Sequence, residues 1–173
     1  ESLSELLNRE GPLPEQRIID IARQIASALG AAHAKGIVHR DVKPDNVMLV
    51  VRRSGGEENR LHPVLLDFGI AKMRADHGAG LTRSGAFLGT MAYMAPEQFG
   101  SAKFADRRTD VYALGAVLYQ MVTGGFYAWG DPDNKVGSTE QLYYRQVTEP
   151  PPDPRARNPA VSPALAELVR WAL

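Results

Sequence analysis

Four short motifs of fixed residue types stand out in the sequence. In chain order they are His39-Arg40-Asp41-Val42-Lys43-Pro44-Asp45-Asn46, Asp67-Phe68-Gly69, Ala95-Pro96-Glu97 and Asp110. The oxygens of Asn46 and Asp67 are the hard ligands that Mg²⁺ prefers. The carboxylate of Asp41 can accept a proton from a hydroxyl group, and Lys43 can neutralise negative charge on the same side. These types suit phosphoryl transfer, which needs positioning and charge neutralisation more than covalent catalysis.

Taken together, the motifs resemble those of the protein kinase family, over essentially all 173 residues. Residues 67–97 look especially like the activation segment of bacterial receptor-type Ser/Thr kinases. The resemblance implies a protein-kinase-like α+β fold, specifically a partial domain over 1–173. This part would be the mainly α-helical C-terminal lobe with a small β-hairpin, from after the hinge to the next-to-last helix. The expected reaction is transfer of the γ-phosphoryl group of ATP to Ser or Thr hydroxyls of proteins, with Mg²⁺ or Mn²⁺.

The resemblance also assigns roles to individual residues. The expected catalytic residues are Asp41, Lys43 and Thr90. The residues expected to bind the nucleotide and its metal ion are Lys43, Asn46, Met48 and Asp67. Within that set Asn46 and Asp67 would hold the metal, and Met48 would pack against the adenine, with a plain core position as the alternative. Thr90 would contact the other two catalytic residues and support selection of the substrate hydroxyl.

Other polar residues receive structural interpretations. By resemblance, His39 is expected to pack beneath the Phe68 ring, and the Asp110 carboxylate to brace the backbone near residues 39 and 40. Glu97 is expected to pair with an arginine in a helix that this sequence does not include. The remaining histidines share no metal-ligand spacing and are expected to be solvated or hydrogen-bonded, on a helix end and two loops: His33, His62 and His77.

A regulatory site is expected in the activation segment. In the family, the arginine that precedes the catalytic aspartate is partnered by a phosphorylated loop residue, and Arg40 holds that position here. Thr82 and Ser84 are the candidate phosphorylation sites, because a phosphate adds about −1.5 to −2 charges and can order a loop against a guanidinium. The alternative is that both are unmodified, solvated hydroxyls.

The elements that must position these residues can be predicted from periodicity and turn signals. Helices are expected at 2–9, from Pro14 to about Gly36, at 110–122, at 138–147 capped by Ser138, and from Ser162 onward. Short buried strands are expected at 37–38, 47–51 and 64–66, the last two forming a hairpin around the 54–56 turn. The 110–122 stretch is apolar nearly all round, so this helix should be buried on every side. Residues 72–90 and 126–137 are predicted to be irregular.

Composition narrows the function classes. Twenty basic and twenty acidic residues cancel, so the charge balance gives no argument for a nucleic-acid partner, and none is expected. The chain has no cysteine, which excludes disulfides and Cys-based zinc sites. No apolar run approaches the roughly 20 residues of a membrane-spanning helix. A cytoplasmic location is expected, with bacterial relatives often anchored by a segment not in this chain.

Several kinase features are missing from the sequence. It contains neither a Gly-rich phosphate loop nor the Val-Ala-Ile-Lys lysine, and we expect an N-terminal lobe outside this chain to supply them. The 173-residue chain alone is therefore expected to bind ATP very weakly and to transfer no phosphate. The expected partners are protein substrates, that N-terminal lobe, and a second kinase domain for trans-autophosphorylation.

Two functions other than an active Ser/Thr kinase would require different residues in this sequence. A pseudokinase or scaffold module would be favoured by loss of a catalytic or metal-binding residue, and Asp41, Lys43, Asn46 and Asp67 are all intact. A small-molecule phosphotransferase would lack the Ala-Pro-Glu motif and the long activation segment. Lys43 favours Ser/Thr over Tyr as acceptor, because tyrosine kinases carry an Ala-Ala-Arg type of loop.

Overall fold

The computed structural model describes residues 1–52, 60–67, 90–99 and 106–173. The α-helices of this part are α1 (Leu3–Glu10), α2 (Glu15–His33), α5 (Arg107–Thr123), α6 (Thr139–Thr148) and α7 (Pro163–Ala172). Its strands are β1 (Val47–Arg52) and β2 (Arg60–Leu65), and short 3₁₀ helices span Pro44–Asn46, Pro96–Gln98 and Pro154–Ala156. The described chain is thus mostly helical with one two-stranded antiparallel sheet. No described helix is both long and apolar enough to cross a membrane.

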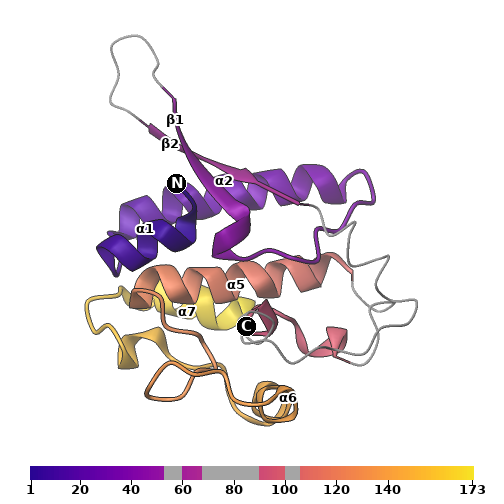
Figure 1. Cartoon of the computed structure of the whole chain (residues 1–173), viewed down its shortest axis with the longest axis vertical. Helices are drawn as coiled ribbons and strands as arrows, with labels where there is room; N and C mark the ends of the chain where they lie inside the picture. The colour runs from indigo at the N-terminus through magenta and orange to yellow at the C-terminus, as the bar shows by residue number, and fades with distance from the viewer. Residues whose placement is uncertain (53–59, 68–89, 100–105) are drawn as a thin grey trace.

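Helix α5 forms the centre of the molecule, between α2 on one side and α7 on the other (Figure 1). Thirteen of its seventeen residues are buried, which confirms the predicted burial on nearly every side. A Cβ at Gly115 would lie 2.8 Å from the Cβ of Ala172, so the missing side chain lets α7 approach closely. Gly124 ends the helix in the left-handed conformation, with φ +77.

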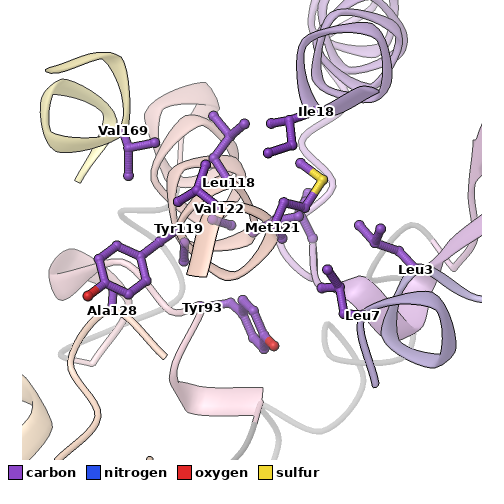
Figure 2. Close-up of a cluster of buried hydrophobic side chains, with 14 of the residues drawn as sticks. Leu3, Leu7, Ile18, Tyr93, Leu118, Tyr119, Met121, Val122, Ala128 and Val169 are labelled. Carbon is purple, nitrogen blue, oxygen red and sulfur yellow. The ribbon is translucent and has the colours of Figure 1, made fainter. Parts of the chain in front are cut away.

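The core joins both ends of the sequence around α5. Leu3 and Leu7 of α1, Ile18 of α2 and Val169 of α7 gather around α5, which contributes Met121 among others (Figure 2). The helices predicted at 2–9, from Pro14 to about Gly36, at 110–122 and from Ser162 onward supply these side chains, each helix turning apolar residues toward the core.

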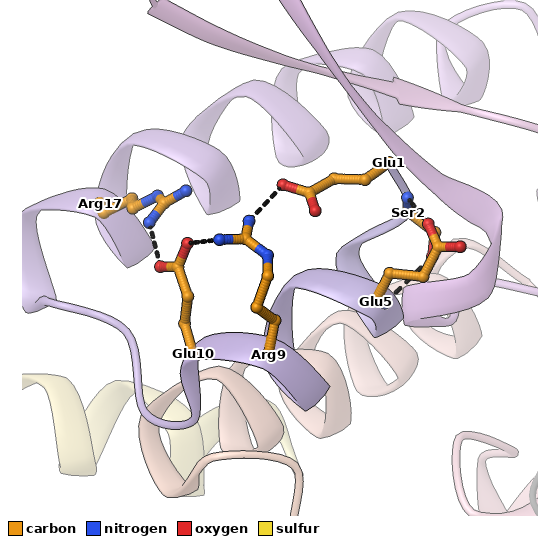
Figure 3. Close-up of polar contacts among 6 residues, drawn as sticks. All are labelled: Glu1, Ser2, Glu5, Arg9, Glu10 and Arg17. Carbon is orange, nitrogen blue, oxygen red and sulfur yellow. Dashed lines mark hydrogen bonds and ion pairs between the residues drawn. The ribbon is translucent and has the colours of Figure 1, made fainter.

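Polar contacts hold α1 against the start of α2 (Figure 3). Arg9 pairs with Glu1 at 2.7 Å and with Glu10 at 2.8 Å, and Glu10 in turn pairs with Arg17 of α2 at 2.6 Å. Ser2 and Glu5 form a reciprocal capping box at the first turn of α1. The residues lie on the surface, so they orient the two helices without contributing to the core.

The predicted hairpin is present and carries the candidate site at its base. β1 and β2 pair antiparallel from Val47 opposite Leu65 to Arg52 opposite Arg60. The strands are less buried than predicted, since Val50, Val51 and Val64 are each about half exposed. His62 lies on β2, so the prediction that it sits on a loop was wrong. The 54–56 turn lies outside the described residues.

The predicted strand at 37–38 does not form. Gly36 has φ +72 and ends the turn after α2, and the Ile37 N–H bonds back to the carbonyl of Ala32 at 3.0 Å. Ile37 is 48% exposed, and residues 37–43 form a loop. Two apolar β-branched residues resemble a strand in sequence, but a strand also needs a partner to satisfy its backbone groups. Asp41 therefore lies on a loop that follows a helix, not between two strands.

Candidate functional site

The loop before Asp41 is held by one buried carboxylate. Asp110, in the first turn of α5, is fully buried, and its two oxygens accept the backbone N–H groups of His39 and Arg40, both at 2.8 Å. Arg40 has φ +64, a conformation that non-glycine residues rarely adopt. Satisfying both N–H groups stabilises this unusual turn, and it confirms the bracing role predicted for Asp110.

His33 contacts the same carboxylate, a relationship that the sequence analysis missed. The Nε2 of His33, in the last turn of α2, lies 2.7 Å from Oδ2 of Asp110, and the His33 side chain is 15% exposed. The two residues are 77 positions apart, so no local pattern could have paired them. Of the two environments predicted for His33, the structure shows the hydrogen-bonded one and not the solvated one.

His39 connects the two loops of the site. The ring is fully buried; its Nδ1 lies 3.3 Å from the backbone N–H of Asp41, and its Nε2 lies 3.0 Å from the carbonyl of Leu66. The neutral tautomer with its proton on Nε2 satisfies both contacts. His39 thus joins the backbone of Asp41 to the residue before Asp67, in addition to the structural role predicted beneath Phe68, a residue outside the described part.

Two predicted residues, Asn46 and Lys43, contact the Asp41 carboxylate, and a third, Thr90, contacts Lys43. Asn46 donates from Nδ2 to Oδ2 of Asp41 at 3.0 Å and to its backbone carbonyl at 2.8 Å. The Lys43 ammonium lies 3.7 Å from the same carboxylate and donates to Oγ1 of Thr90 at 3.2 Å. Asp41 and Lys43 keep side-chain exposures of 17% and 20%, so the group is sheltered but reachable.

The two predicted metal ligands lie at the base of the hairpin. Asn46 ends the 3₁₀ helix before β1, and Asp67 follows β2; between them the Leu66 N–H donates to the Asn46 carbonyl at 2.8 Å. Asp67 is exposed, with φ +50. Both hydrogen bonds that the Asn46 side chain makes to Asp41 use Nδ2, which leaves its amide oxygen as a hard ligand for a metal ion. Among the described residues no cluster of three or more His, Cys, Asp or Glu side chains could hold a metal.

Met48 lies next to this base on β1. It is partly buried, forms an isolated bridge with Ser2, and lies outside the cluster of buried core residues. Met48 is therefore not a plain core residue. Its contact with adenine stays a prediction.

The predicted regulatory residues are placed only in part. Arg40 is partly buried, and within the described ranges no carboxylate lies within 4 Å of its guanidinium. Thr82 and Ser84 lie outside the described residues, as does His77. The Glu97 carboxylate accepts a hydrogen bond from Oγ1 of Thr109 at 3.1 Å.

Segment 90–94 forms the wall opposite Asp41 and is tied to helices on two sides. The Tyr93 hydroxyl donates to Oε1 of Gln120 on α5 at 2.6 Å, and Nε2 of Gln146 on α6 donates to the Met94 carbonyl at 3.1 Å. Burial raises the pKa of Tyr93 well above its ordinary value, so this hydroxyl stays protonated as a donor. A cavity of about 10 Å³, the size of one water, lies between Asp41, Thr90 and Tyr93. Sequence analysis did not identify these tethers.

Comparison with known proteins gives the same family throughout the chain. A family model described as protein kinase domain matches residues 1–173. Serine/threonine-protein kinase pkn3 of Myxococcus xanthus is 41% identical, with 100% of this chain and 30% of the relative covered. Serine/threonine-protein kinase Pkn1 of the same organism is 45% identical, over 94% of this chain and 22% of the relative. Serine/threonine-protein kinase PknD of Mycobacterium tuberculosis is 40% identical, over 97% and 23%.

These relatives are bacterial Ser/Thr kinases, as the sequence resemblance predicted. The chain spans less than a third of the length of each of them. The match with the family model nevertheless runs from the first residue to the last. The chain therefore belongs to the protein kinase domain family.

Proposed function

We propose that this chain is the C-terminal lobe of a Ser/Thr protein kinase and carries its phosphotransfer site. The supporting observation is the convergence of Asn46 and Lys43 on the Asp41 carboxylate, with Thr90 on the far side of the lysine. The substrates would be ATP and a Ser or Thr hydroxyl of a protein. The phosphate-binding residues absent from this sequence would come from an N-terminal lobe elsewhere in the protein.

In this proposal Asp41 is the base that receives the acceptor proton. Its carboxylate is oriented from one side by the amide of Asn46, and its backbone is fixed through the N–H contact with His39. A carboxylate held in one orientation accepts a proton from a hydroxyl without first reorganising. Asn46 therefore positions the base in addition to any role toward a metal.

Lys43 supplies positive charge between Asp41 and Thr90, beside which the acceptor hydroxyl would lie. Its ammonium is 3.7 Å from Asp41 and donates to Thr90, so it lies where the transferred phosphoryl group would carry negative charge. Thr90 in turn fixes the lysine and presents a hydroxyl beside the acceptor position. This arrangement neutralises charge during transfer without a covalent intermediate.

The residues at the hairpin base fit a magnesium ion. The amide oxygen of Asn46 and the exposed carboxylate of Asp67 are hard oxygen donors, and Mg²⁺ needs only one or two such protein ligands beside waters and phosphates. When bound, the ion would neutralise charge on the ATP phosphates. Met48, at the adjoining position on β1, would meet the adenine.

Two alternatives make different predictions. A pseudokinase or scaffold module would keep the fold without turnover, and a small-molecule phosphotransferase would act on a free hydroxyl compound. The intact contacts among Asp41, Lys43 and Asn46 support an active enzyme. The relatives' names, all Ser/Thr protein kinases, support a protein acceptor.

The test uses the full-length protein that contains this chain, incubated with Mg²⁺, ATP labelled on its γ-phosphate and a mixture of protein acceptors. We expect label on Ser and Thr, and a loss of about 10²–10⁴-fold in turnover for Asp41→Asn. Asp133→Asn, which changes a 77% exposed carboxylate, is the matched control and should be unaffected. Label on small hydroxyl compounds alone, or full turnover in Asp41→Asn, would refute the proposal.

Regulation and location complete the proposal. Phosphorylation of Thr82 and Ser84 by a second kinase domain would provide the anionic partner for Arg40. The kinase domain would work in the cytoplasm, whether or not another segment of the protein anchors it to the membrane. Fractionation of cells, with the full-length protein followed by antibody, tests the location independently of activity.

A further inference from the structure

The hairpin of β1 and β2 has one covered edge and one open edge. On the β2 side, Nε2 of Gln24 on α2 donates to the Leu61 carbonyl at 3.4 Å, and Pro63 has no N–H to satisfy. On the other side, the described sheet has no further strand beside β1, and Val50 and Val51 are 46% and 51% exposed. The two strands extend past α2 in Figure 1. The open edge of the hairpin is therefore that of β1.

The backbone of β1 shows which N–H groups face this open edge. Neighbouring residues of an antiparallel strand point their N–H groups to opposite sides. The Leu66 N–H donates to the Asn46 carbonyl at 2.8 Å, so the even-numbered positions of β1 hydrogen-bond to β2. The odd-numbered positions face outward, and the Leu49 N–H donates to the Glu1 carbonyl at 2.8 Å. The Val51 N–H also faces outward, and none of the described residues outside the hairpin accepts it.

The first residues of the chain form the beginning of a third strand along this edge. Ser2 makes an antiparallel bridge with Met48, and Glu1 lies opposite Leu49 through the hydrogen bond to its carbonyl. The two partners of an antiparallel ladder run in opposite directions, so each step backward from Glu1 is a step forward along β1. The residue immediately before Glu1 in the full-length protein therefore comes opposite Val50.

The composition of β1 gives a separate reason for its edge to be covered. Residues 47–51 are Val-Met-Leu-Val-Val, with no charged residue and no proline. Proteins protect a sheet edge with charges, prolines, bulges or a covering segment, because an open apolar strand pairs with other chains. The pairing of β1 with β2 is continuous and contains no bulge. Of these four means of protection, a covering segment is the one left for β1.

We propose that the residues immediately before Glu1 continue along β1 as a third antiparallel strand, opposite Val50 and Val51. This inference rests on the proposed function, in which an N-terminal lobe precedes this part of the protein. The second residue before Glu1 accepts the outward Val51 N–H with its carbonyl. The connection to the N-terminal lobe is thus a paired strand and not a free linker, and it holds that lobe at one position relative to Asn46 and Asp67 at the base of the hairpin.

Disulfide formation in the full-length protein tests this register. One cysteine replaces the residue immediately before Glu1 and is combined in turn with Val50→Cys, Val51→Cys or Val64→Cys; the described chain has no cysteine of its own to compete. The pair of Glu1 with Leu49 is hydrogen-bonded, so the next pair is of the non-hydrogen-bonded kind. Its Cα atoms lie about 4.5 Å apart, within the range that a disulfide spans.

We expect efficient cross-linking on mild oxidation with Val50→Cys and not with the two matched controls. Val51→Cys is adjacent in sequence but points to the other face of the sheet. Val64→Cys has nearly the same exposure as Val50, at 45%, but lies on β2, one strand farther from the new strand. The cross-linked protein should keep the turnover and the ATP KM of its reduced form, because the disulfide fixes a pairing that is already present.

Amide hydrogen exchange in the unmodified full-length protein gives a second measurement, which needs no variant to fold. The Val51 N–H should exchange as slowly as the Leu49 N–H. Cross-linking that does not favour Val50→Cys, loss of activity on cross-linking, or fast exchange at Val51 would each overturn the proposal. Absence of protein kinase activity in the unmodified protein refutes the proposed function itself, whereas any of those results in an active protein refutes only this inference.

Discussion

The amide of Asn46 donates both of its hydrogen bonds to one residue, the Oδ2 and the backbone carbonyl of Asp41, at 3.0 and 2.8 Å. A single side chain thus fixes the direction of the proposed base and the loop that carries it. Because Nδ2 is used in this way, the amide oxygen is the atom of the Asn46 side chain that is left to bind a metal ion. The two functions that sequence reasoning separates, metal binding and orientation of the base, are combined in one residue.

The first prediction concerns this pair. Asn46→Ala should reduce turnover at least about tenfold even at saturating Mg²⁺, since a hydrogen bond to a charged group contributes about 1.5–3 kcal/mol. A residue that served only as a metal ligand would be rescued by raising the metal concentration. Titration of initial rates with Mg²⁺ distinguishes the two cases. Asn8→Ala, an exposed amide on α1, is the control and should behave as wild type.

The second prediction concerns Asp110 and stability. Asp110→Ala removes the acceptor for the buried N–H groups of His39 and Arg40 and leaves His33 without its partner. With an unsatisfied buried donor costing about 1–3 kcal/mol, we expect a loss of about 2–5 kcal/mol in unfolding free energy. Denaturant titration of the full-length protein measures it. Asp106→Ala, at the exposed N-cap of the same helix, should cost less; an equal loss would mean that the carboxylate does not brace the loop.

Features that depend on residues close in sequence could be predicted, whereas contacts between residues far apart in sequence could not. Ser138 and Ser162 cap their helices, as predicted, because a cap acts through neighbouring residues; Gly124 ends α5 in the same local way. A hairpin between strands at 47–51 and 64–66 was predicted; β1 and β2 do pair, but β2 begins earlier and runs over Arg60–Leu65. The contact between His33 and Asp110 spans 77 positions and leaves no local signal, so it was missed.

The candidate site shows the same division. The residue types around Asp41 were read directly from the motif, but their geometry depends on the left-handed Arg40, which no propensity predicts. The predicted strand at 37–38 failed for a related reason: Ile37 and Val38 have the right composition, but the turn at Gly36 leads them into a loop. The hydrogen bond from Gln146 to the Met94 carbonyl joins residues 52 positions apart, so no local sequence pattern could predict it.

A third prediction uses the raised pKa of Tyr93. Burial is its main cause, and Tyr127 and Asp45 add to it. Because the pKa is higher in the folded than in the unfolded state, the stabilisation is complete below the ordinary value of 10.0 and is lost as pH rises above it. Denaturation midpoints should therefore fall above about pH 10. Tyr93→Phe should make this fall shallower, and an unchanged slope would contradict the assignment.

A fourth prediction concerns the contact between α5 and α7. Gly115→Ala would place a Cβ 2.8 Å from the Cβ of Ala172, so α7 must shift outward. Overpacking of this kind costs about 1–3 kcal/mol. Ala172→Gly in the same molecule should recover part of the loss, and only part, because the backbone carbon of residue 172 is also within 3.1 Å. Calorimetric unfolding of the three variants tests it; no recovery in the double variant would place the strain elsewhere.

The last prediction concerns Arg40. Among the described residues no carboxylate lies within ion-pair distance of the Arg40 guanidinium. Arg40 directly precedes Asp41 in the sequence. A phosphate on Thr82 or Ser84 would supply the missing anion through charge-assisted hydrogen bonds of about 1.5–3 kcal/mol each, which can shift the equilibrium of a segment about 10- to 150-fold. Mass spectrometry of the active full-length protein should therefore find phosphate at one or both positions.

Thr82→Ala with Ser84→Ala should lower activity, and Arg40→Ala should add little to that loss because both changes break the same interaction. Arg23→Ala, whose side chain is 78% exposed on α2, is the control for loss of a cation. Full activity in the double alanine variant, or phosphate found only outside residues 67–97, would place the switch elsewhere in the protein.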